Sequence, residues 1–126
     1  MQRGQHPTLG NGKICYLEIP ANDVDQAAAF YRKVFGWQSR RRGDGSMAFD
    51  DGVGEVSGTW TRGRKPVAEP GVLIYIMVDN LVSTLGDIVS NGGKIIQSEG
   101  MGREQTARFS DPTGNVFGLY QQPAQS

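Results

Sequence analysis

The spacing of apolar residues changes along the chain and predicts where strands and helices lie. Residues 13–20 are short, apolar and rich in Ile and Tyr, which is typical of a strand. Asp23 follows as a good N-cap residue, and apolar residues then recur at helical spacing. Gly36 supplies a C-terminal stop. The pattern therefore predicts a helix from Val24 to Phe35.

Three short extended segments follow the predicted helix, at residues 37–42, 46–50 and 55–61. Gly-Asp-Gly and Asp-Gly-Val-Gly separate them, and both separators are typical of hairpin turns. Residues 62–70 contain two prolines and four charged residues, so we expect an exposed connector there.

The same order of elements then recurs. Residues 71–78 form a second apolar segment, Asn80 is a second cap, and a second apolar stripe ends at Gly92 and Gly93. The equal spacing of Ile19 and Ile76, and of Asp23 and Asn80, supports a repeat. The second helical stripe consists of Leu81, Leu85, Ile88 and Val89, and the closing strands are residues 93–98, 105–110 and 116–121, with a type I turn at Asp111-Pro112-Thr113-Gly114.

Two βαβββ modules, about 13–61 and 71–121, account for one domain over residues 13–121. Residues 1–12 and 122–126 are expected to be a flexible leader and a flexible tail. The predicted fold class is α+β, with two curved, mostly antiparallel four-stranded sheets around a cup, each backed by a helix.

Strand alternation divides the side chains between the helices and the cup. The set expected to pack on the helices is Cys15, Leu17, Ile19, Ile74, Ile76 and Val78, with Cys15 as a buried, inert thiol. The repeat aligns Val56-Gly58-Trp60 with Val116-Gly118-Tyr120. The set expected to line the cup is Tyr16, Glu18, Gly58, Trp60, Leu73, Tyr75, Met77, Gly118 and Tyr120.

Composition narrows the classes of partner. Thirteen Lys and Arg balance thirteen Asp and Glu, so no overall field favours nucleic acid or an anionic membrane. No apolar segment approaches the roughly 20 residues of a spanning helix, and the N-terminus lacks an apolar signal core, so we expect a cytoplasmic protein. Cys15 and His6 are the only residues of their kinds, which excludes an internal disulfide and disfavours a catalytic Cys-His or Ser-His pair.

Three segments carry a resemblance to a known superfamily: YLEIPANDVDQAAAFYRKVFGW, VDNLVSTLGDIVSNGGKI and FSDPTGNVFGLYQ. The chain resembles the vicinal oxygen chelate superfamily over about residues 13–121. That superfamily includes glyoxalase I, extradiol dioxygenases, fosfomycin-resistance enzymes and bleomycin-binding proteins. The resemblance concerns the fold and does not name a reaction. It also implies a homodimer.

Metal-dependent members of the superfamily carry His, Glu or Gln ligands on the first and last strands of each module. At the positions that the resemblance assigns, this chain has Tyr16, Leu73, Gly58 and Gly118. None of these is a ligand of the imidazole, carboxylate or thiolate type that such centres use. We therefore expect no metal and no other cofactor.

The leading hypothesis is a metal-independent binding protein that takes up a small, partly aromatic ligand in the cup or in a dimer-interface cleft. The candidate ligand-binding residues are Tyr16, Glu18, Trp60, Tyr75, Met77, Arg108 and Tyr120. The alternative for Glu18 is a structural ion pair with an arginine such as Arg108. The alternative for the aromatic residues is ordinary filling of the sheet surface. The basic residues 40–42 and 62–65 are interpreted as solvated charges.

Two other functions stay open at this point. The first is an enzyme of the same fold, a lyase or oxidoreductase that acts on a small metabolite, through its own side chains or with a divalent metal. The second is an interaction module with no ligand of its own.

Overall fold

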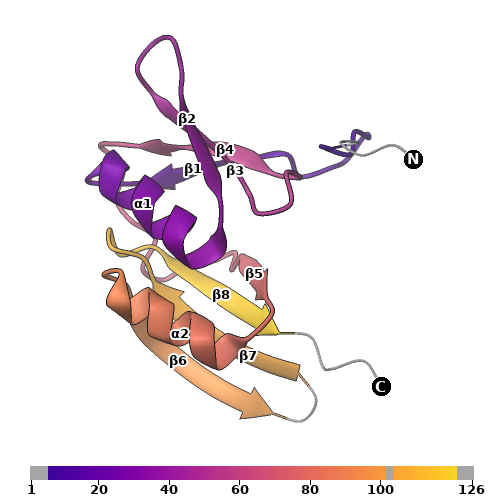
Figure 1. Ribbon diagram of the computed structural model, residues 1–126, viewed down its shortest axis with the longest axis vertical. Helices are drawn as coiled ribbons and strands as arrows, with labels where there is room; N and C mark the ends of the chain where they lie inside the picture. The colour runs from indigo at the N-terminus through magenta and orange to yellow at the C-terminus, as the bar shows by residue number, and fades with distance from the viewer. Residues whose placement is uncertain (1–5, 102–103, 122–126) are drawn as a thin grey trace. The chain divides into compact units, whose positions relative to one another are not determined.

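The computed structural model describes residues 6–101 and 104–121. The chain divides into two compact units, Met1–Arg64 and Lys65–Ser126. Each unit contains one four-stranded sheet and one helix, in the order that the sequence predicts (Figure 1). The α+β architecture of two βαβββ modules is therefore confirmed.

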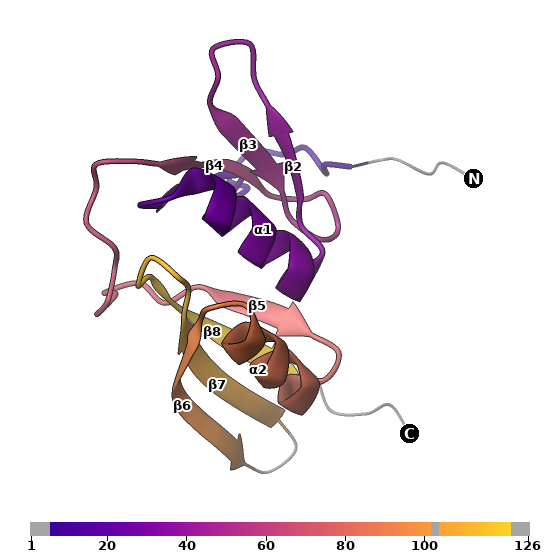
Figure 2. The same ribbon diagram turned by 60° about the vertical axis from the view of Figure 1, so that its left-hand side comes forward.

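The first unit has its strands in the order β1-β4-β3-β2. β1 and β4 are parallel, whereas the other two pairs are antiparallel. Figure 2 shows the turn between β2 and β3 projecting beyond the helix. The elements are β1 (Tyr16–Pro20), α1 (Val24–Phe35), β2 (Gln38–Arg41), β3 (Met47–Asp50) and β4 (Ser57–Thr61).

α1 has the bounds that the sequence predicts, because both of its ends are capped by the expected residues. The Asp23 side chain accepts a hydrogen bond of 3.0 Å from the Gln26 backbone N–H. At the other end Gly36 adopts φ 74°, which favours glycine, and its N–H donates to the Arg32 carbonyl. The buried face of the helix comprises Ala27, Ala28, Phe30 and Tyr31.

Trp60 belongs to the core beneath α1, so its predicted place in the cup is wrong. β1 pairs Ile19 with Trp60, and both side chains are buried, Trp60 with only 3% of its surface exposed. The Trp60 ring lies 4.7 Å from the Phe49 ring and 6.0 Å from the Tyr31 ring, measured between centroids. The indole is therefore part of the packed core of the first unit.

Gly58 also faces the helix side, which contradicts its predicted place in the cup. A Cβ at Gly58 would collide with the Leu17 carbonyl oxygen and with the Phe49 ring. The pairing of Glu18 with Thr59 matches that of Tyr75 with Gly118, so Thr59 corresponds to Gly118 in the repeat. The sequence alignment was off by one residue in this strand, and a slip of one residue exchanges the two faces.

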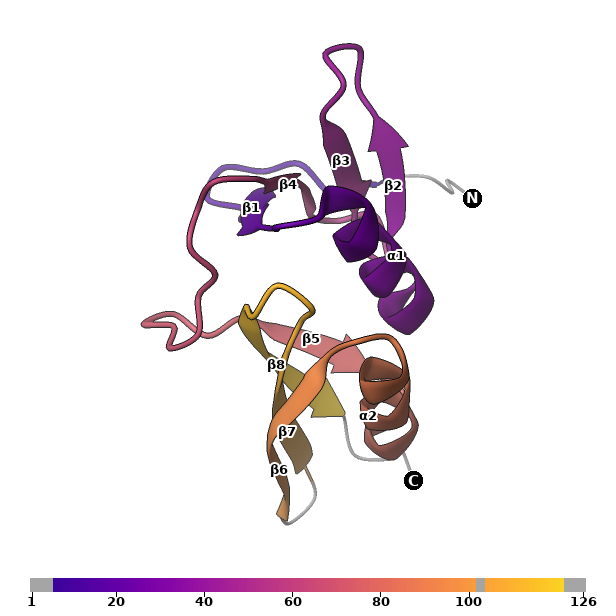
Figure 3. The same cartoon turned by 90° about the vertical axis from the view of Figure 1, so that its left-hand side faces the viewer.

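The second unit repeats the arrangement with the strand order β5-β8-β7-β6. β5 and β8 are parallel and the other pairs are antiparallel. Seen from the side in Figure 3, α2 covers one face of this sheet. The elements are β5 (Tyr75–Val78), α2 (Leu81–Ser90), β6 (Lys94–Met101), β7 (Glu104–Ser110) and β8 (Val116–Gln121).

Side chains that alternate along β7 and β8 fill the space under α2. Asn80 caps the helix by accepting a hydrogen bond of 2.9 Å from the Ser83 N–H. The predicted helical stripe is wrong at Val89, which is exposed, and Thr84 is buried in the stripe. The buried residues of this core are Leu81, Thr84, Ile88, Ala107, Phe109, Phe117 and Leu119.

Cys15 is exposed, so the prediction of a buried thiol on the helix side is wrong. Cys15 precedes β1, and the alternation of faces holds only within a strand. The predicted flexible leader lies outside the described residues over 1–5, and the predicted tail, 122–126, lies wholly outside them. Neither described helix is long and apolar enough to cross a membrane.

Candidate functional site

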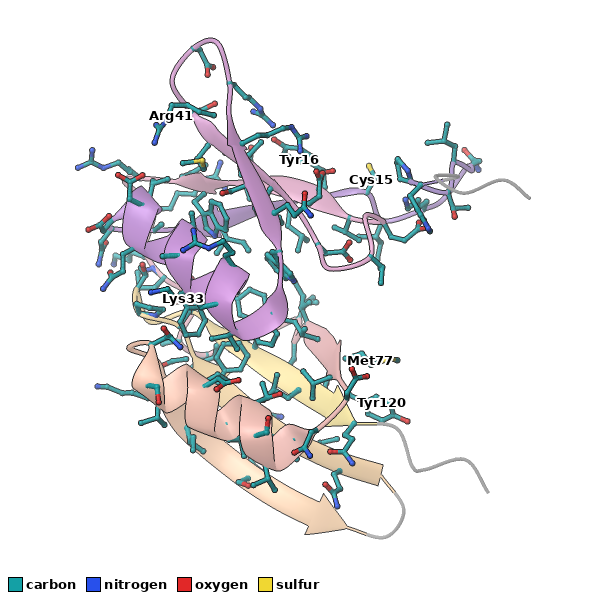
Figure 4. All side chains as sticks on the ribbon, in the orientation of Figure 1. Cys15, Tyr16, Lys33, Arg41, Met77 and Tyr120 are labelled. Carbon is teal, nitrogen blue, oxygen red and sulfur yellow. The ribbon has the colours of Figure 1, made fainter. Side chains whose placement is uncertain are left out.

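The face of each sheet turned away from its helix is here called its open face. On the open face of the second sheet, side chains from three strands surround a shallow hollow of about 400 Å³. Figure 4 shows Met77 and Tyr120 side by side on this unit. The residues that line the hollow are Tyr75, Met77, Thr106 and Tyr120.

Strand pairing explains why these residues meet. Across β5, β8 and β7, one row of paired residues is Tyr75, Gly118 and Arg108. The neighbouring row is Met77, Tyr120 and Thr106. Residues paired side by side in a sheet point to the same face, so both rows lie on the open face.

Gly118 forms the floor beneath Tyr75. A Cβ at Gly118 would lie 2.7 Å from two atoms of the Tyr75 ring, closer than real Cβ contacts. The phenol ring of Tyr75 therefore lies over a backbone that offers no side chain. A larger residue at this position would displace the Tyr75 ring from the hollow.

Large apolar side chains are exposed at this place. Tyr75 has 50% of its surface exposed and Met77 has 63%. Single exposed apolar residues are common, but a cluster around a hollow is typical of a binding surface. The arrangement can receive the flat face of an aromatic compound between Tyr75, Met77 and Tyr120.

The open face of the first sheet is polar and consists of paired charges. Glu18 accepts a hydrogen bond of 2.6 Å from Arg64, so its partner is Arg64 rather than Arg108. Arg40 pairs with Asp50, whose other carboxylate oxygen accepts a hydrogen bond from the Ser57 hydroxyl. This supports the structural interpretation of Glu18.

Arg42 and Tyr16 form the third contact on this face. The Arg42 guanidinium donates to the Tyr16 hydroxyl and lies 5.8 Å from the centre of the Tyr16 ring. The hydrogen bond with Tyr16 raises the pKa of Arg42, so this side chain stays charged at every accessible pH. Its neighbour Arg41 turns to the helix side and pairs with Asp25 at 3.2 Å.

The side chains do not fit the metal centres that the superfamily resemblance implies. Among residues 6–98 and 105–121, whose side chains the structure describes, no three His, Cys, Asp or Glu side chains are placed to hold one ion. Glu18 is held by Arg64, Asp50 is held by Arg40, and His6 contacts Glu55. Each of these potential ligands therefore has another partner.

A second, larger hollow of about 710 Å³ lies in the first unit, beside the start of α1. It includes the Arg41–Asp25 pair as well as Trp60 and Thr61. The Trp60 Nε1 and Thr61 Oγ1 atoms are buried without a hydrogen-bond partner in the described part of the chain. Such atoms are typical places for a bound water. The charges of the acidic and basic side chains that line this hollow balance each other, and the ring of Trp60 is buried.

The described part of the leader makes hydrogen bonds and ion pairs with Glu55, just before β4. His6 Nδ1 lies 2.7 Å from Glu55 Oε2, the Thr8 N–H donates to Oε1 at 3.0 Å, and Lys13 Nζ lies 3.2 Å from Oε1. The hydrogen bond with His6, followed by those with Thr8 and Lys13, lowers the pKa of Glu55 to about 2. The carboxylate is therefore ionised in this contact.

We expect acid to release the leader from Glu55. The folded-state pKa lies below the ordinary 4.5, so the contact is fully present above pH 4.5 and weakens as the pH falls toward 2. The NMR shift of the Thr8 amide should follow this titration, and Glu55→Gln should give the released shift at pH 7. Glu69→Gln, at an exposed connector position, is the control. A Thr8 shift that Glu55→Gln leaves unchanged would contradict the contact.

The structure brings together four of the seven predicted site residues, Tyr75, Met77, Arg108 and Tyr120, on one open face. Tyr16 and Glu18 lie on the open face of the first sheet, and Trp60 lies on neither. Sequence analysis missed Thr106, although its period-two spacing from Arg108 places both on one face. It also missed Arg64 as the partner of Glu18, for which the connector gives no signal.

A family model and a known relative place this chain in the same family. The model of the Glyoxalase/Bleomycin resistance protein/Dioxygenase superfamily matches residues 13–119. A glyoxylase-like domain-containing protein of Didymella fabae is 30% identical over 124 residues, which cover 90% of this chain and 96% of that protein.

Solved structures share the fold at low identity. The hypothetical protein SA1046 from S. aureus has a TM-score of 0.71 at 17% identity, over 89% of this chain and 99% of that one. The fosfomycin resistance protein FosX from Mesorhizobium loti has a TM-score of 0.70 at 13% identity, over 90% of this chain and 93% of that one. A mutant of FosX from Listeria monocytogenes, complexed with Mn(II) and a dihydroxypropylphosphonic acid, has a TM-score of 0.72 at 13% identity, over 90% and 92%. These likenesses concern the fold.

Proposed function

Since the chain belongs to the Glyoxalase/Bleomycin resistance protein/Dioxygenase superfamily, we propose that it binds a small, partly aromatic molecule without a metal. The proposed binding surface is the open face of the second sheet. Its members are Tyr75, Met77, Thr106, Arg108, Gly118 and Tyr120.

The observation that carries the proposal is the exposed apolar cluster over Gly118. Tyr75 and Met77 keep half or more of their surface in water, in a chain that buries most of its aromatic residues. Covering such surface with a ligand is favourable by about 25 cal/mol per Å² of apolar area. Tyr offers a rigid ring, and Met offers a flexible thioether side chain that adapts to the shape of a ligand.

Metal independence rests on the ligand chemistry of this chain. The lining of the hollow offers phenol, thioether and hydroxyl groups, and Arg108 in the neighbouring row adds a guanidinium. None of these is a usual ligand of a catalytic divalent metal. On the first sheet, the carboxylates Glu18 and Asp50 are neutralised by arginines. Binding without a metal is the function that these side chains support best.

A homodimer in the cytoplasm is part of the same proposal. The superfamily is often dimeric, and pairing would enclose an otherwise open surface. Light scattering at micromolar concentration should give twice the 13.7 kDa of one chain. A monomer at that concentration would remove the dimer from the proposal but leave the binding surface.

Native mass spectrometry of the untagged protein tests the proposal first. One spectrum gives the number of subunits, any bound metal and any co-purified organic molecule. A dimer without metal, with or without an organic adduct, is the expected result. Stoichiometric zinc, nickel, iron or manganese would overturn metal independence.

Replacing Tyr75 with alanine should weaken the binding of a neutral two-ring probe, 2-naphthamide. Loss of one stacking partner is expected to lower the affinity about tenfold, which corresponds to roughly 1.4 kcal/mol. Fluorescence titration measures this, and Val82→Ala, an exposed apolar position on α2, is the matched control. Equal affinities for the two variants would count against the surface.

The catalytic alternative is supported by the Arg42–Tyr16 contact on the first sheet. A phenol held by a guanidinium is a positioned group that can donate a proton. If this alternative holds, Tyr16→Phe abolishes turnover of a small metabolite and leaves 2-naphthamide binding unchanged. Turnover that Tyr16→Phe leaves intact would exclude this role.

A further inference from the structure

We propose that the ligand of the second sheet carries a negative charge beside its aromatic ring, and that Arg108 selects for that charge. This inference rests on the proposed binding function of the open face and adds the chemical class of the ligand: a small aromatic carboxylate or a similar aryl anion.

The position of Arg108 is the first argument. Arg108 on β7 pairs with Gly118 on β8, and Gly118 pairs with Tyr75 on β5. Neighbouring strands lie about 4.8 Å apart, so the backbones of Tyr75 and Arg108 are about 10 Å apart, and the Tyr75 ring lies over Gly118 between them. A ligand ring that stacks on the exposed side of the Tyr75 ring could therefore extend its anionic group toward Arg108.

The charge of Arg108 is the second argument. Arg108 is exposed, and in the described chain its guanidinium has neither an ion pair nor a hydrogen bond. Arg40 and Arg64 on the other sheet, by contrast, are each paired with a carboxylate. Across the strands, Arg108 pairs with Gly118 on one side and Gln97 on the other, and both neighbours are uncharged. Arg108 therefore presents a positive charge in its row that an anionic ligand can complement.

The chemistry of the guanidinium fixes the kind of anion. Its planar fork donates two parallel hydrogen bonds to a carboxylate or a related oxyanion, which a single-point cation does not do. The Thr106 hydroxyl lies two residues along the same strand face and can donate a further hydrogen bond. Tyr75, Met77 and Tyr120 supply the contact for the ring.

The test compares two probes that differ in charge on the same ring system, 2-naphthoate and 2-naphthamide, on the full chain at pH 7. We expect 2-naphthoate to bind roughly tenfold more tightly, since a charge-assisted hydrogen bond contributes about that much. Arg108→Gln should abolish the difference between the probes, so that this variant binds 2-naphthoate no more tightly than it binds 2-naphthamide. Arg62→Gln, at another exposed arginine without an ion pair among the described residues, is the matched control.

The outcomes separate this inference from the proposed function. Equal binding of both probes, or a loss in Arg62→Gln as large as in Arg108→Gln, would overturn the charge selection and keep the binding surface. Failure of both probes to bind would overturn the proposed function itself. Dissociation of a dimer by Arg108→Gln would identify the occupant of the face as a second copy of the chain, which also overturns the inference.

Discussion

Replacing Trp60 with alanine is expected to lower the free energy of unfolding by about 3–5 kcal/mol. The indole is buried between α1 and the first sheet and contacts Phe49 and Tyr31, so its removal leaves a large cavity. Small domains are stable by only about 5–15 kcal/mol, so much of the stability of this protein would be lost. Urea denaturation followed by circular dichroism measures the change.

Trp60→Phe is the matched control for this prediction. It keeps a ring in the core and removes the buried Nε1–H, which has no partner in the described residues. We therefore expect a cost below about 1.5 kcal/mol. For Trp60→Ala, the folded fraction should still bind 2-naphthamide with unchanged affinity. A loss of affinity without a loss of stability would return Trp60 to the binding surface.

The helices were predictable because their signals are local. Asp23 and Asn80 each accept a hydrogen bond from the backbone three residues later, and Gly36 adopts the left-handed conformation that ends α1. These effects depend on a few neighbouring residues, so the sequence contains them in full. The bounds of α1 were predicted correctly for this reason.

Alternation predicted the faces of β1, β5 and β8 correctly but not those of β4. In the second module, alternation placed Tyr75, Met77 and Tyr120 together, as the pairing of β5 with β8 confirms. In the first module, Trp60 of β4 appeared equivalent to Tyr120 of the second module. Their equivalence depends on the lengths of the loops between helix and last strand, which alternation does not measure, and one residue of error moved Trp60 to the wrong face.

The charge pairs were beyond sequence analysis for a different reason. Glu18 and Arg64 lie at distant positions, and a long arginine side chain can reach several carboxylates. Which pair forms depends on the course of the connector. The same limit applies to Glu55, whose partners come from the leader.

The two open faces have different chemistry despite the repeat. The first presents arginines that are already satisfied by Glu18, Asp50 and Tyr16. The second presents Tyr75 and Met77 in water beside Arg108. The two modules therefore share backbone pairing but not side-chain polarity, and the proposed ligand binding is expected on the face where apolar surface and charge are both available.

The turn between β7 and β8 depends on one buried carboxylate. Asp111 Oδ1 accepts hydrogen bonds of 2.9–3.0 Å from the backbone N–H groups of Thr113, Gly114 and Asn115. Its Oδ2 accepts from the Asn115 side-chain amide at 2.9 Å, and Asn115 Oδ1 in turn accepts from the Val67 N–H. Asp111 and Asn115 are both buried, at 4% and 2% exposure. The turn therefore fixes the connector to the sheet.

Asp111→Ala is expected to lower the free energy of unfolding by at least about 3 kcal/mol, because it leaves several buried donors without an acceptor. The double variant Asp111→Asn with Asn115→Asp exchanges the two side chains and keeps one donor facing one acceptor. It should be more stable than Asp111→Asn alone, in which two amide groups meet. Urea denaturation of the parent chain, Asp111→Asn, Asn115→Asp and the double variant gives the coupling energy between the two positions. If the exchange recovers nothing relative to Asp111→Asn, the contact between the side chains does not stabilise the turn, and its stability comes from the backbone hydrogen bonds of Asp111 alone.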